Sequence, residues 1–222
     1  MKRRVEPELM SAEQQARAYS QADFEAAHSF YPKLFAEKFP RRPRQAFVLD
    51  LGCGPCDVTL RFAKANSGYT FHAVDGSAAM LKYGRRALAR QRRLARRFRL
   101  IEGFIPGALI PRSSYDVILS SSFLHHLHDP QVLWQTVRTY ARRGTIVFVP
   151  DLRRPPSRAE AAAMTQKYSG NEPEVLQRDF FNSLLAAFTA PEVKRQLKEA
   201  GLNGLQVEII SDRHLLVFGR IT

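Results

Sequence analysis

The residues best suited to hold a polar ligand are gathered in one short glycine-rich stretch. Residues 48–63 read VLDLGCGPCDVTLRFA, which is an apolar run, a glycine loop and then the pattern of an amphipathic helix. This order exposes backbone N–H groups at the start of the helix, where they can bind a polar ligand. A phosphate, a dinucleotide and a different kind of ligand are the alternatives at this point.

The residues beside the glycine loop narrow the choice of ligand. A phosphate-binding loop ends in Gly-Lys-Ser or Gly-Lys-Thr, whereas Asp57, Val58 and Thr59 follow here. A dinucleotide fingerprint needs a small residue where this chain has Asp57. The carboxylates of Asp50 and Asp57 would also repel a pyrophosphate. A ligand that carries positive charge close to the loop fits them better.

A further carboxylate points to the rest of the ligand. Asp75 ends the next predicted strand, 21 residues after Gly54. In nucleotide-binding sheets, a carboxylate at this position receives the two hydroxyls of a ribose. An adenosine at Asp75, together with a cationic amino-acid portion near Asp50, describes S-adenosylmethionine.

With these residues the sequence resembles the class I S-adenosylmethionine-dependent methyltransferases. The matching segments are VLDLGCGP (48–55), FHAVDGSAAML (71–81), YDVILSSSFLHHL (115–127) and GTIVFVPD (144–151). The resemblance covers roughly residues 46–150 and implies S-adenosyl-L-methionine as the cofactor. The cofactor-binding residues that it implies are Asp50, Gly52, Cys53, Gly54, Asp75, Gly76, Ser77, Phe104, Ser120 and Ser121.

The resemblance also implies a role for each part of this set. The glycine loop would lie against the methionyl part, Asp75 would bind the ribose, and backbone carbonyls at Ser120 and Ser121 would lie beside the methionyl amino group. Gly76 and Ser77 would lie near the adenine edge. One departure is Phe104, because many members have an acid there that accepts the adenine amino group. Phe104 is expected to pack against the adenine instead.

Strand and helix patterns alternate between residues 46 and 150, which predicts a parallel sheet covered on both faces. The strands expected there are Ala46–Asp50, Thr70–Val74, Phe98–Glu102, Asp116–Ser120 and Thr145–Val149. Segments 205–210 and 215–218 are joined by so short a connection that the last strand is expected to run antiparallel. The predicted fold class is therefore α/β, with a Rossmann-like, seven-stranded, mostly parallel sheet in one domain over residues 1–222.

Helical segments flank the predicted core of residues 46–150. Residues 1–45 form an N-terminal helical cover, residues 151–190 a helical insertion, and residues 191–222 a final helix and hairpin. Capping boxes are expected at Ser11, Ser157 and Thr189. Ligands of open α/β sheets lie beyond the carboxyl ends of the strands, so the first two segments are expected to close over a methyl acceptor as lids.

Candidate catalytic residues lie near that edge. By resemblance, His126 is the better placed of the neighbouring histidines for proton transfer at the acceptor, and Tyr19 belongs to the N-terminal cover with Asp23, Phe24, His28 and Tyr31. No metal site is expected, because the consecutive histidines 125 and 126 on a helical turn should point in different directions. Cys53 and Cys56 form a single CxxC inside the loop and are expected to be small loop residues, not a redox or zinc pair.

Charge and composition leave two other functions open. The net charge is +13, from 34 basic and 21 acidic residues, and many arginines fall in Arg85–Arg99. A solvated helix face is one interpretation of this run, and an anion-binding face is the other. No apolar run is long enough to span a bilayer, and no apolar stretch follows the basic N-terminus, so a cytoplasmic location is expected. We expect methyl transfer to a small-molecule acceptor. The alternatives are an RNA or protein methyltransferase that docks its substrate on the arginine helix, and a non-catalytic cofactor-binding module.

Overall fold

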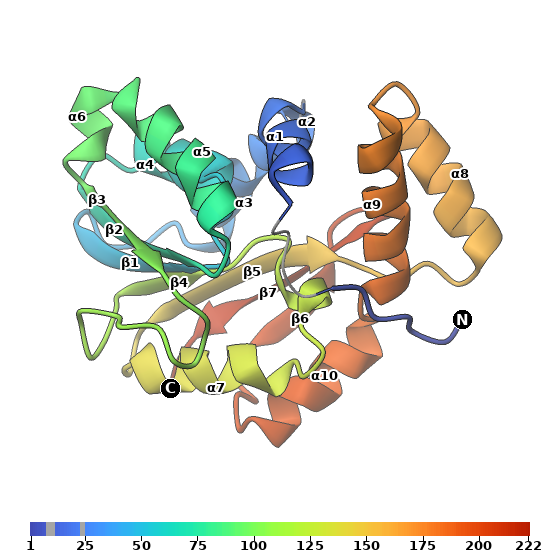
Figure 1. The fold of residues 1–222 in the computed structure, drawn as a ribbon. Helices are drawn as coiled ribbons and strands as arrows, with labels where there is room; N and C mark the ends of the chain where they lie inside the picture. Colours follow the sequence, from blue (N-terminus) through green and yellow to red (C-terminus); the bar gives the residue numbers. More distant parts are fainter. Residues whose placement is uncertain (8–11, 23–24) are drawn as a thin grey trace.

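The computed structural model describes residues 1–7, 12–22 and 25–222, and a seven-stranded sheet forms its centre (Figure 1). The strand order is β3-β2-β1-β4-β5-β7-β6. The strands are β1 (Ala46–Leu51), β2 (Tyr69–Asp75), β3 (Phe98–Glu102), β4 (Val117–Leu119), β5 (Ile146–Leu152), β6 (Gln206–Ile209) and β7 (His214–Arg220). Strands β1 to β5 are parallel to their neighbours among themselves, and β7 is antiparallel to both β5 and β6. The predicted fold class and the antiparallel last strand are confirmed.

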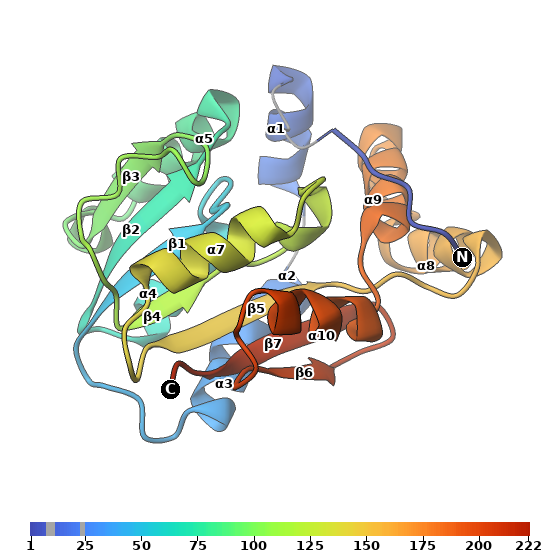
Figure 2. The ribbon, with the colours of Figure 1, turned by 90° about the horizontal axis from the view of Figure 1, so that it is seen from below.

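Helices cover both faces of the sheet. The described helices are α1 (Glu13–Gln21), α2 (Glu25–His28), α3 (Phe30–Lys38), α4 (Asp57–Ala65), α5 (Ala78–Ala89), α6 (Arg92–Ala95), η1 (Leu124–His126), α7 (Gln131–Tyr140), α8 (Arg158–Ser169), α9 (Glu174–Ala186) and α10 (Ala190–Glu199). Helices α7 and α10 lie in front of the sheet in Figure 2, and α3 and α4 lie behind it. Across the residues that the structure describes, none of these helices has the length and apolar character that crossing a membrane demands.

Alternation along the central strands produces two hydrophobic cores. Leu49 packs with α7 and α10 on one face, whereas Val48 packs with α3 and α4 on the other. In β5, Val147 and Phe148 divide between the two cores in the same way. Strands that are buried on both faces read as nearly continuous apolar runs, which is why these segments could be recognised in the sequence.

Strand β5 is longer than the sequence predicted. It was expected to end at Val149 but continues to Leu152, because β7 pairs with it along its whole length up to His214. Asp151 is therefore part of the sheet and almost fully buried.

The two expected lid segments lie beyond the carboxyl ends of the strands. Helices α8 and α9 form an antiparallel pair, and α1 stands between α9 and α5 (Figure 1). Ser157 and Thr189 cap the following helices as predicted, and Thr189 does so in a capping box with Glu192. The predicted cap at Ser11 and the lid candidates Asp23 and Phe24 lie outside the described residues.

The arginine run does not form the single helix that was expected. Helix α5 ends at Ala89, and the short α6 follows before the chain enters β3. Arg97 donates hydrogen bonds to four backbone carbonyls, those of Ala63, Asn66, Ser67 and Tyr69. The last carbonyls of a helix lack partners within it, and a basic side chain can satisfy them. Arg97 therefore ties the end of α4 to the start of β2.

Candidate active site

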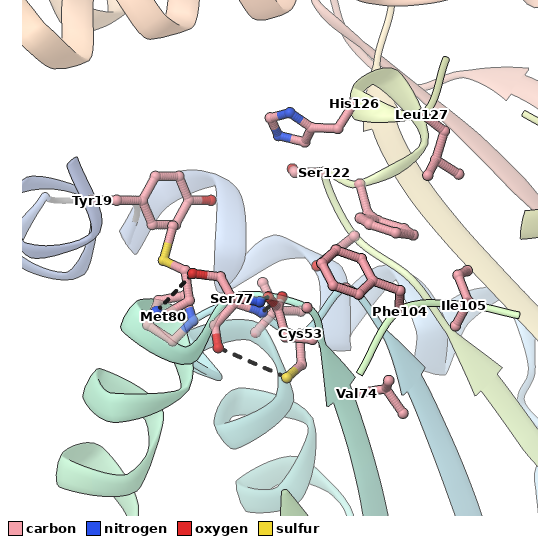
Figure 3. Close-up of a pocket in the computed structure, with 18 of the residues that line it drawn as sticks. Tyr19, Cys53, Val74, Ser77, Met80, Phe104, Ile105, Ser122, His126 and Leu127 are labelled. Atoms are coloured by element: carbon pink, nitrogen blue, oxygen red, sulfur yellow. Dashed lines mark hydrogen bonds between the residues drawn. The ribbon is translucent and has the colours of Figure 1, made fainter. Parts of the chain in front are cut away.

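A cavity of about 180 Å³ lies at the carboxyl ends of the central strands (Figure 3). Its wall contains most of the residues that the sequence singled out for the cofactor: Gly52, Cys53, Gly54, Asp75, Gly76, Ser77, Phe104 and Ser121. Tyr19 from α1 and His126 from η1 point into the same space from opposite sides. Parallel strands end at one edge of a sheet, so separate segments meet there.

The carboxylate of Asp75 binds the backbone just before two helices, α4 and α5. Its Oδ2 accepts the backbone N–H of Gly54 at 2.7 Å, and its Oδ1 accepts the backbone N–H of Ser77 at 2.8 Å. Burial raises the pKa of Asp75, while the two backbone hydrogen bonds act in the opposite direction. A carboxylate has about four acceptor positions, so Asp75 can position the loop and still accept two hydroxyl groups.

The loop backbone takes a shape that needs small residues. Gly52 and Gly54 have φ values of 73° and 52°. A Cβ on Gly52 would lie 2.3 Å from Cγ of Phe123, so a larger residue cannot replace this glycine without moving the ring. Cys56, at a φ of 65°, also has the left-handed conformation that favours glycine.

The two cysteines of the loop have different surroundings. Cys53 lines the cavity, whereas Cys56 is fully buried beneath the loop. A Cβ on Gly84 of α5 would lie 3.1 Å from Cys56 Sγ. Gly84 thus leaves space for the thiol, and Cys56 acts as a packing residue under the loop.

Two predicted cofactor residues do not line the cavity. Asp50 is buried, Thr59 donates a hydrogen bond to its carboxylate, and burial raises the pKa of Asp50 to about 7. Ser120 is also buried and donates its hydroxyl to the carbonyl of Leu51 at 2.8 Å. Successive side chains of a strand alternate in direction, so Ser120 at the end of β4 turns into the sheet while Ser121 reaches the cavity.

Ser122 was not singled out in the sequence, although it lies on the wall of the cavity. It has a φ of 50°, the only other positive value besides that of Cys56 among the described non-glycine residues. The run of three serines at positions 120–122 gave no signal that would separate the buried one from the two exposed to the cavity.

A second cavity of about 240 Å³ adjoins the first and is lined largely by the lid segments. It is lined from α1, α3, α8 and α9 and from the β6–β7 turn, by residues that include Tyr31, Leu152, Tyr168, Leu176, Asp179, Phe180, Arg213 and His214. Four residues line both cavities: Tyr19, His28, Ser122 and His126. Most of the second wall comes from residues far apart in the chain, and no motif marked them.

Asp151 fixes the segment that presents the histidines. Its Oδ2 accepts the backbone N–H groups of Phe123 and Leu124, both at 2.8 Å, and its Oδ1 lies 2.6 Å from Nδ1 of His125. The charge of Asp151 and its hydrogen bond raise the pKa of His125 against the effect of burial. The pKa of His126 is well below its ordinary value because of burial and the neighbouring His125.

Tyr19 has the opposite character to His126. Burial raises the pKa of its hydroxyl well above the ordinary value. Tyr19 therefore keeps its proton at neutral pH, and it lines the junction of the two cavities.

The two consecutive histidines converge, contrary to the prediction. Their ring centroids are 4.2 Å apart. Oε1 of Glu6, from the N-terminal segment, lies 3.2 Å from Nδ1 of His126 and 3.8 Å from Nε2 of His125. The rings direct different nitrogens to one point, a geometry that the assumption of a regular helical turn did not allow.

The core around the first cavity matches a known family. Residues 49–147 match the model of the family described as a methyltransferase domain. This part of the chain is therefore a methyltransferase domain, and its fold is shared by solved S-adenosylmethionine-dependent methyltransferases. The protein is an enzyme of the type that transfers a methyl group. A search of curated protein sequences finds no match.

Solved structures share the fold of this methyltransferase at low identity. A SAM-dependent methyltransferase from Aquifex aeolicus is 16% identical, with a TM-score of 0.68 over 94% of this chain and 98% of that one. A protein from Methanococcus maripaludis, provisionally described as an S-adenosyl-L-methionine-dependent methyltransferase, is 16% identical, with a TM-score of 0.70 over 100% and 97%. The plantazolicin methyltransferase BpumL, in complex with a monoazolic desmethylPZN analogue and SAH, is 14% identical, with a TM-score of 0.65 over 94% and 86%.

The residues of the first cavity fit the cofactor of this family. Asp75 offers acceptor positions for ribose hydroxyls, and the glycine loop offers backbone that a ligand can approach closely. Phe104, 64% exposed at the cavity wall, offers an aromatic face on which an adenine can pack.

Proposed function

We propose that this methyltransferase transfers the methyl group of S-adenosylmethionine to a small-molecule acceptor held in the second cavity. The observation that carries the proposal is the junction of the two cavities, which Tyr19, His28, Ser122 and His126 line together. A methyl group donated from the first cavity would meet a nucleophile from the second at this point.

In this proposal the first cavity holds the cofactor. Asp75 accepts the ribose hydroxyls, Phe104 packs against the adenine, and the loop at Gly52 and Gly54 faces the methionyl part. Ser121 lies beside the methionyl amino group. Asp50 acts indirectly, because it is buried under the loop and fixes it through Thr59.

The bound cofactor supplies a methyl group on a sulfonium, which an in-line displacement removes. The protein aligns the acceptor with this methyl group and keeps water away. Such alignment can remove a large part of the activation free energy. Tyr19 donates a hydrogen bond to the acceptor at the junction. When the acceptor is a hydroxyl or thiol, the imidazole of His126 accepts its proton.

The walls and the volume of the second cavity favour a small acceptor over RNA or a protein. Helices α1, α8 and α9 line this cavity, which has a volume of about 240 Å³. A structural neighbour, the plantazolicin methyltransferase BpumL, is described in complex with a monoazolic desmethylPZN analogue and SAH, which supports a small-molecule acceptor. The residues of the arginine run, in contrast, lie outside the walls of both cavities. Two of them, Arg86 and Arg90, border a separate surface pocket.

A two-part experiment tests the proposal. The purified protein is incubated with S-adenosylmethionine and a panel of small hydroxyl, thiol, amine and acidic carbon compounds, and formation of SAH is measured. Tyr19→Phe serves as the variant at the junction, and Tyr140→Phe, on α7 and outside the walls of both cavities, serves as the matched control. We expect turnover of one compound class, a reduced kcat for Tyr19→Phe and no change for Tyr140→Phe.

Hydrogen exchange supplies the second part. Closure of the lids would protect residues 12–22 and 158–186 when SAH binds. Protection that stays confined to the glycine loop and Asp75, combined with no turnover across the panel, would contradict a lidded small-molecule enzyme. Turnover of bulk RNA that is lost at high salt would instead favour docking on the arginines.

A further inference from the structure

Three potential metal ligands converge beside the junction of the cavities. Glu6 comes from the N-terminal segment, and His125 and His126 come from η1. The carboxylate oxygen of Glu6 and one ring nitrogen of each histidine all lie within 4.8 Å of one another. Glu6 Oε1 is 3.2 Å from His126 Nδ1 and 3.8 Å from His125 Nε2.

These spacings are close to those of ligands that share one ion. Zinc binds histidine nitrogen and carboxylate oxygen at about 2.0–2.2 Å, so two ligands of a tetrahedral site lie about 3.3 Å apart. The pair formed by Glu6 and His126 already has this separation. Nε2 of His125 lies 3.8 Å from Glu6 Oε1, about 0.5 Å beyond this separation, and the ligand atoms of the two histidines lie within 4.8 Å of each other.

The surroundings direct the required nitrogens to this point. Nδ1 of His125 is bound to Asp151 Oδ1 at 2.6 Å, which leaves Nε2 for Glu6 and an ion. A histidine ligand commonly has its other nitrogen on a carboxylate, which fixes its tautomer and orientation. Nδ1 of His126 is buried and makes no hydrogen bond to the described part of the chain.

Glu6 is held in place from both sides. Ser183 of α9 donates its hydroxyl to Glu6 Oε1 at 3.0 Å, and the ring of His128 lies 2.8 Å from the Glu6 carbonyl. Arg3 anchors the same segment by donating to the carbonyls of His125 and Leu127, at 3.0 and 2.8 Å. The N-terminal segment thus runs along η1 and delivers a carboxylate to the histidines.

The local charge balance permits a cation. The guanidinium of Arg3 is the opposing positive charge, but carbonyl oxygens and the ring of Phe188, 3.9 Å away, surround it. Two carboxylates, Glu6 and Asp151, face the histidines. Their combined charge exceeds that of Arg3.

We propose that Glu6, His125 and His126 bind one divalent transition-metal ion of the zinc type. Two histidines and one carboxylate are a ligand set of catalytic zinc sites, in which a further position is open to water or substrate. Both histidines line the second cavity. The open position would therefore face that cavity and take an oxygen or sulfur atom.

The role of the ion rests on the proposed function. An ion at this point would bind a hydroxyl or thiol of the acceptor and make its proton more acidic. Nδ1 of His126 would then be a ligand, so activation of the acceptor would move from the imidazole to the ion.

Zinc binding to the full-length protein tests the site without any methyl acceptor. The protein is treated with a chelator, dialysed and titrated with Zn²⁺ in competition with a chromophoric chelator, and Co²⁺ is added separately to record its visible spectrum. We expect one equivalent of Zn²⁺ and a Co²⁺ spectrum typical of four- or five-coordinate nitrogen and oxygen ligands. Glu6→Gln and His126→Ala should each weaken Zn²⁺ binding by more than about 100-fold, exceeding the roughly 10- to 100-fold loss expected for Asp151→Asn in the outer shell.

Matched variants separate a site from an effect on folding. Glu172→Gln, a carboxylate on the wall of the same cavity outside the cluster, should leave Zn²⁺ affinity unchanged. SAH affinity and thermal unfolding of each variant report whether it is folded. Absence of stoichiometric Zn²⁺ binding, or binding equally tight in Glu6→Gln, would overturn the proposal and leave a proton-sharing group of histidines and a glutamate.

The metal site and the methyl transfer can fail separately. Zinc binding that depends on Glu6, without turnover of any acceptor, would support the site and contradict the proposed function. Turnover that is equally fast in the chelated protein and the Zn²⁺-loaded protein would overturn the role of the ion at the acceptor.

Discussion

The two cavities of this methyltransferase are adjacent but are built in different ways. The first is built by short loops that follow neighbouring strands of the sheet, at residues 52–57, 75–77 and 121–123. The second is closed by α1, by α8 and α9, and by Arg213 and His214 near the end of the chain. A cavity made by strand ends has its geometry imposed by the sheet. A cavity made by covering helices has a geometry that can change with the acceptor, and this difference explains why the fold shows the cofactor class more clearly than the acceptor.

Asp151 belongs to the sheet but supports the second cavity. Its substitution should therefore have the largest effect of those that compare the two cavities. Asp151→Ala removes the acceptor of His125 and of the backbone N–H groups of Phe123, Leu124 and Leu152. Breaking a buried charged pair commonly costs about 3–5 kcal/mol. We expect that loss in the free energy of unfolding, measured in urea. The control Asp212→Ala, at an exposed carboxylate of the β6–β7 turn, should lose less than about 1 kcal/mol.

The second cavity should also be the more sensitive to acid. Burial lowers the pKa of His214 to about 4, whereas an unfolded histidine has a pKa of about 6.5. Above pH 6.5 both states are neutral and the stability from His214 is complete. Between about pH 6.5 and 4 the unfolded state gains the proton first, so stability falls by roughly 2–4 kcal/mol. The measurement is the free energy of unfolding across this range for the wild type and for His214→Gln.

The difference between the two proteins isolates His214 from the other titrating groups. We expect the wild type to lose stability more steeply than His214→Gln as the pH falls. Parallel curves for the two proteins would show that the lid side of the molecule does not bury a neutral histidine.

Substitutions in the first cavity should change the affinity for SAH. Asp75→Ala should weaken SAH binding by about 1.5–3 kcal/mol, or roughly 10- to 150-fold, because hydrogen bonds to a charged group are lost. Asp57→Asn is the matched control, since Asp57 lines the same cavity but its carboxylate is paired with His28 and Arg61. Its effect on SAH affinity should be less than tenfold. Calorimetry that ranks the two variants in the reverse order would contradict the assignment of the ribose to Asp75.

Substitutions outside both cavities should have the smallest effects. Replacing Arg92, Arg93 and Arg96 with glutamine should change the free energy of unfolding by no more than about 0.5 kcal/mol and leave SAH affinity unchanged. Arg97→Gln, which loses four carbonyl partners, should cost about 1–2 kcal/mol. Equal stabilities for the triple variant and Arg97→Gln would show that the hydrogen bonds of the Arg97 guanidinium contribute nothing to the stability of the fold.

Local sequence patterns predicted the first cavity better than the second. The glycine loop and Asp75 belong to one strand–loop–helix unit and the strand after it, so their spacing in the chain reflects their spacing in the fold. The burial of the Asp50 and Ser120 side chains could not be predicted, because the direction of a side chain at the end of a strand depends on where the pleat stops. The position of Glu6 beside His126 depends on the path of the N-terminal segment across the molecule, which no local pattern encodes.

The hydrogen bonds of Arg97 also determine where a protease can cleave the arginine run. A trypsin-like enzyme must take an arginine side chain into its specificity pocket, and Arg92, Arg93 and Arg96 are exposed enough to enter one. The guanidinium of Arg97 is engaged by four carbonyls of the protein itself. Limited digestion of the folded protein should therefore cut after Arg92, Arg93 or Arg96 and spare the bond after Arg97. The two fragments would stay associated through the sheet, because β3 follows the cut and remains paired with β2.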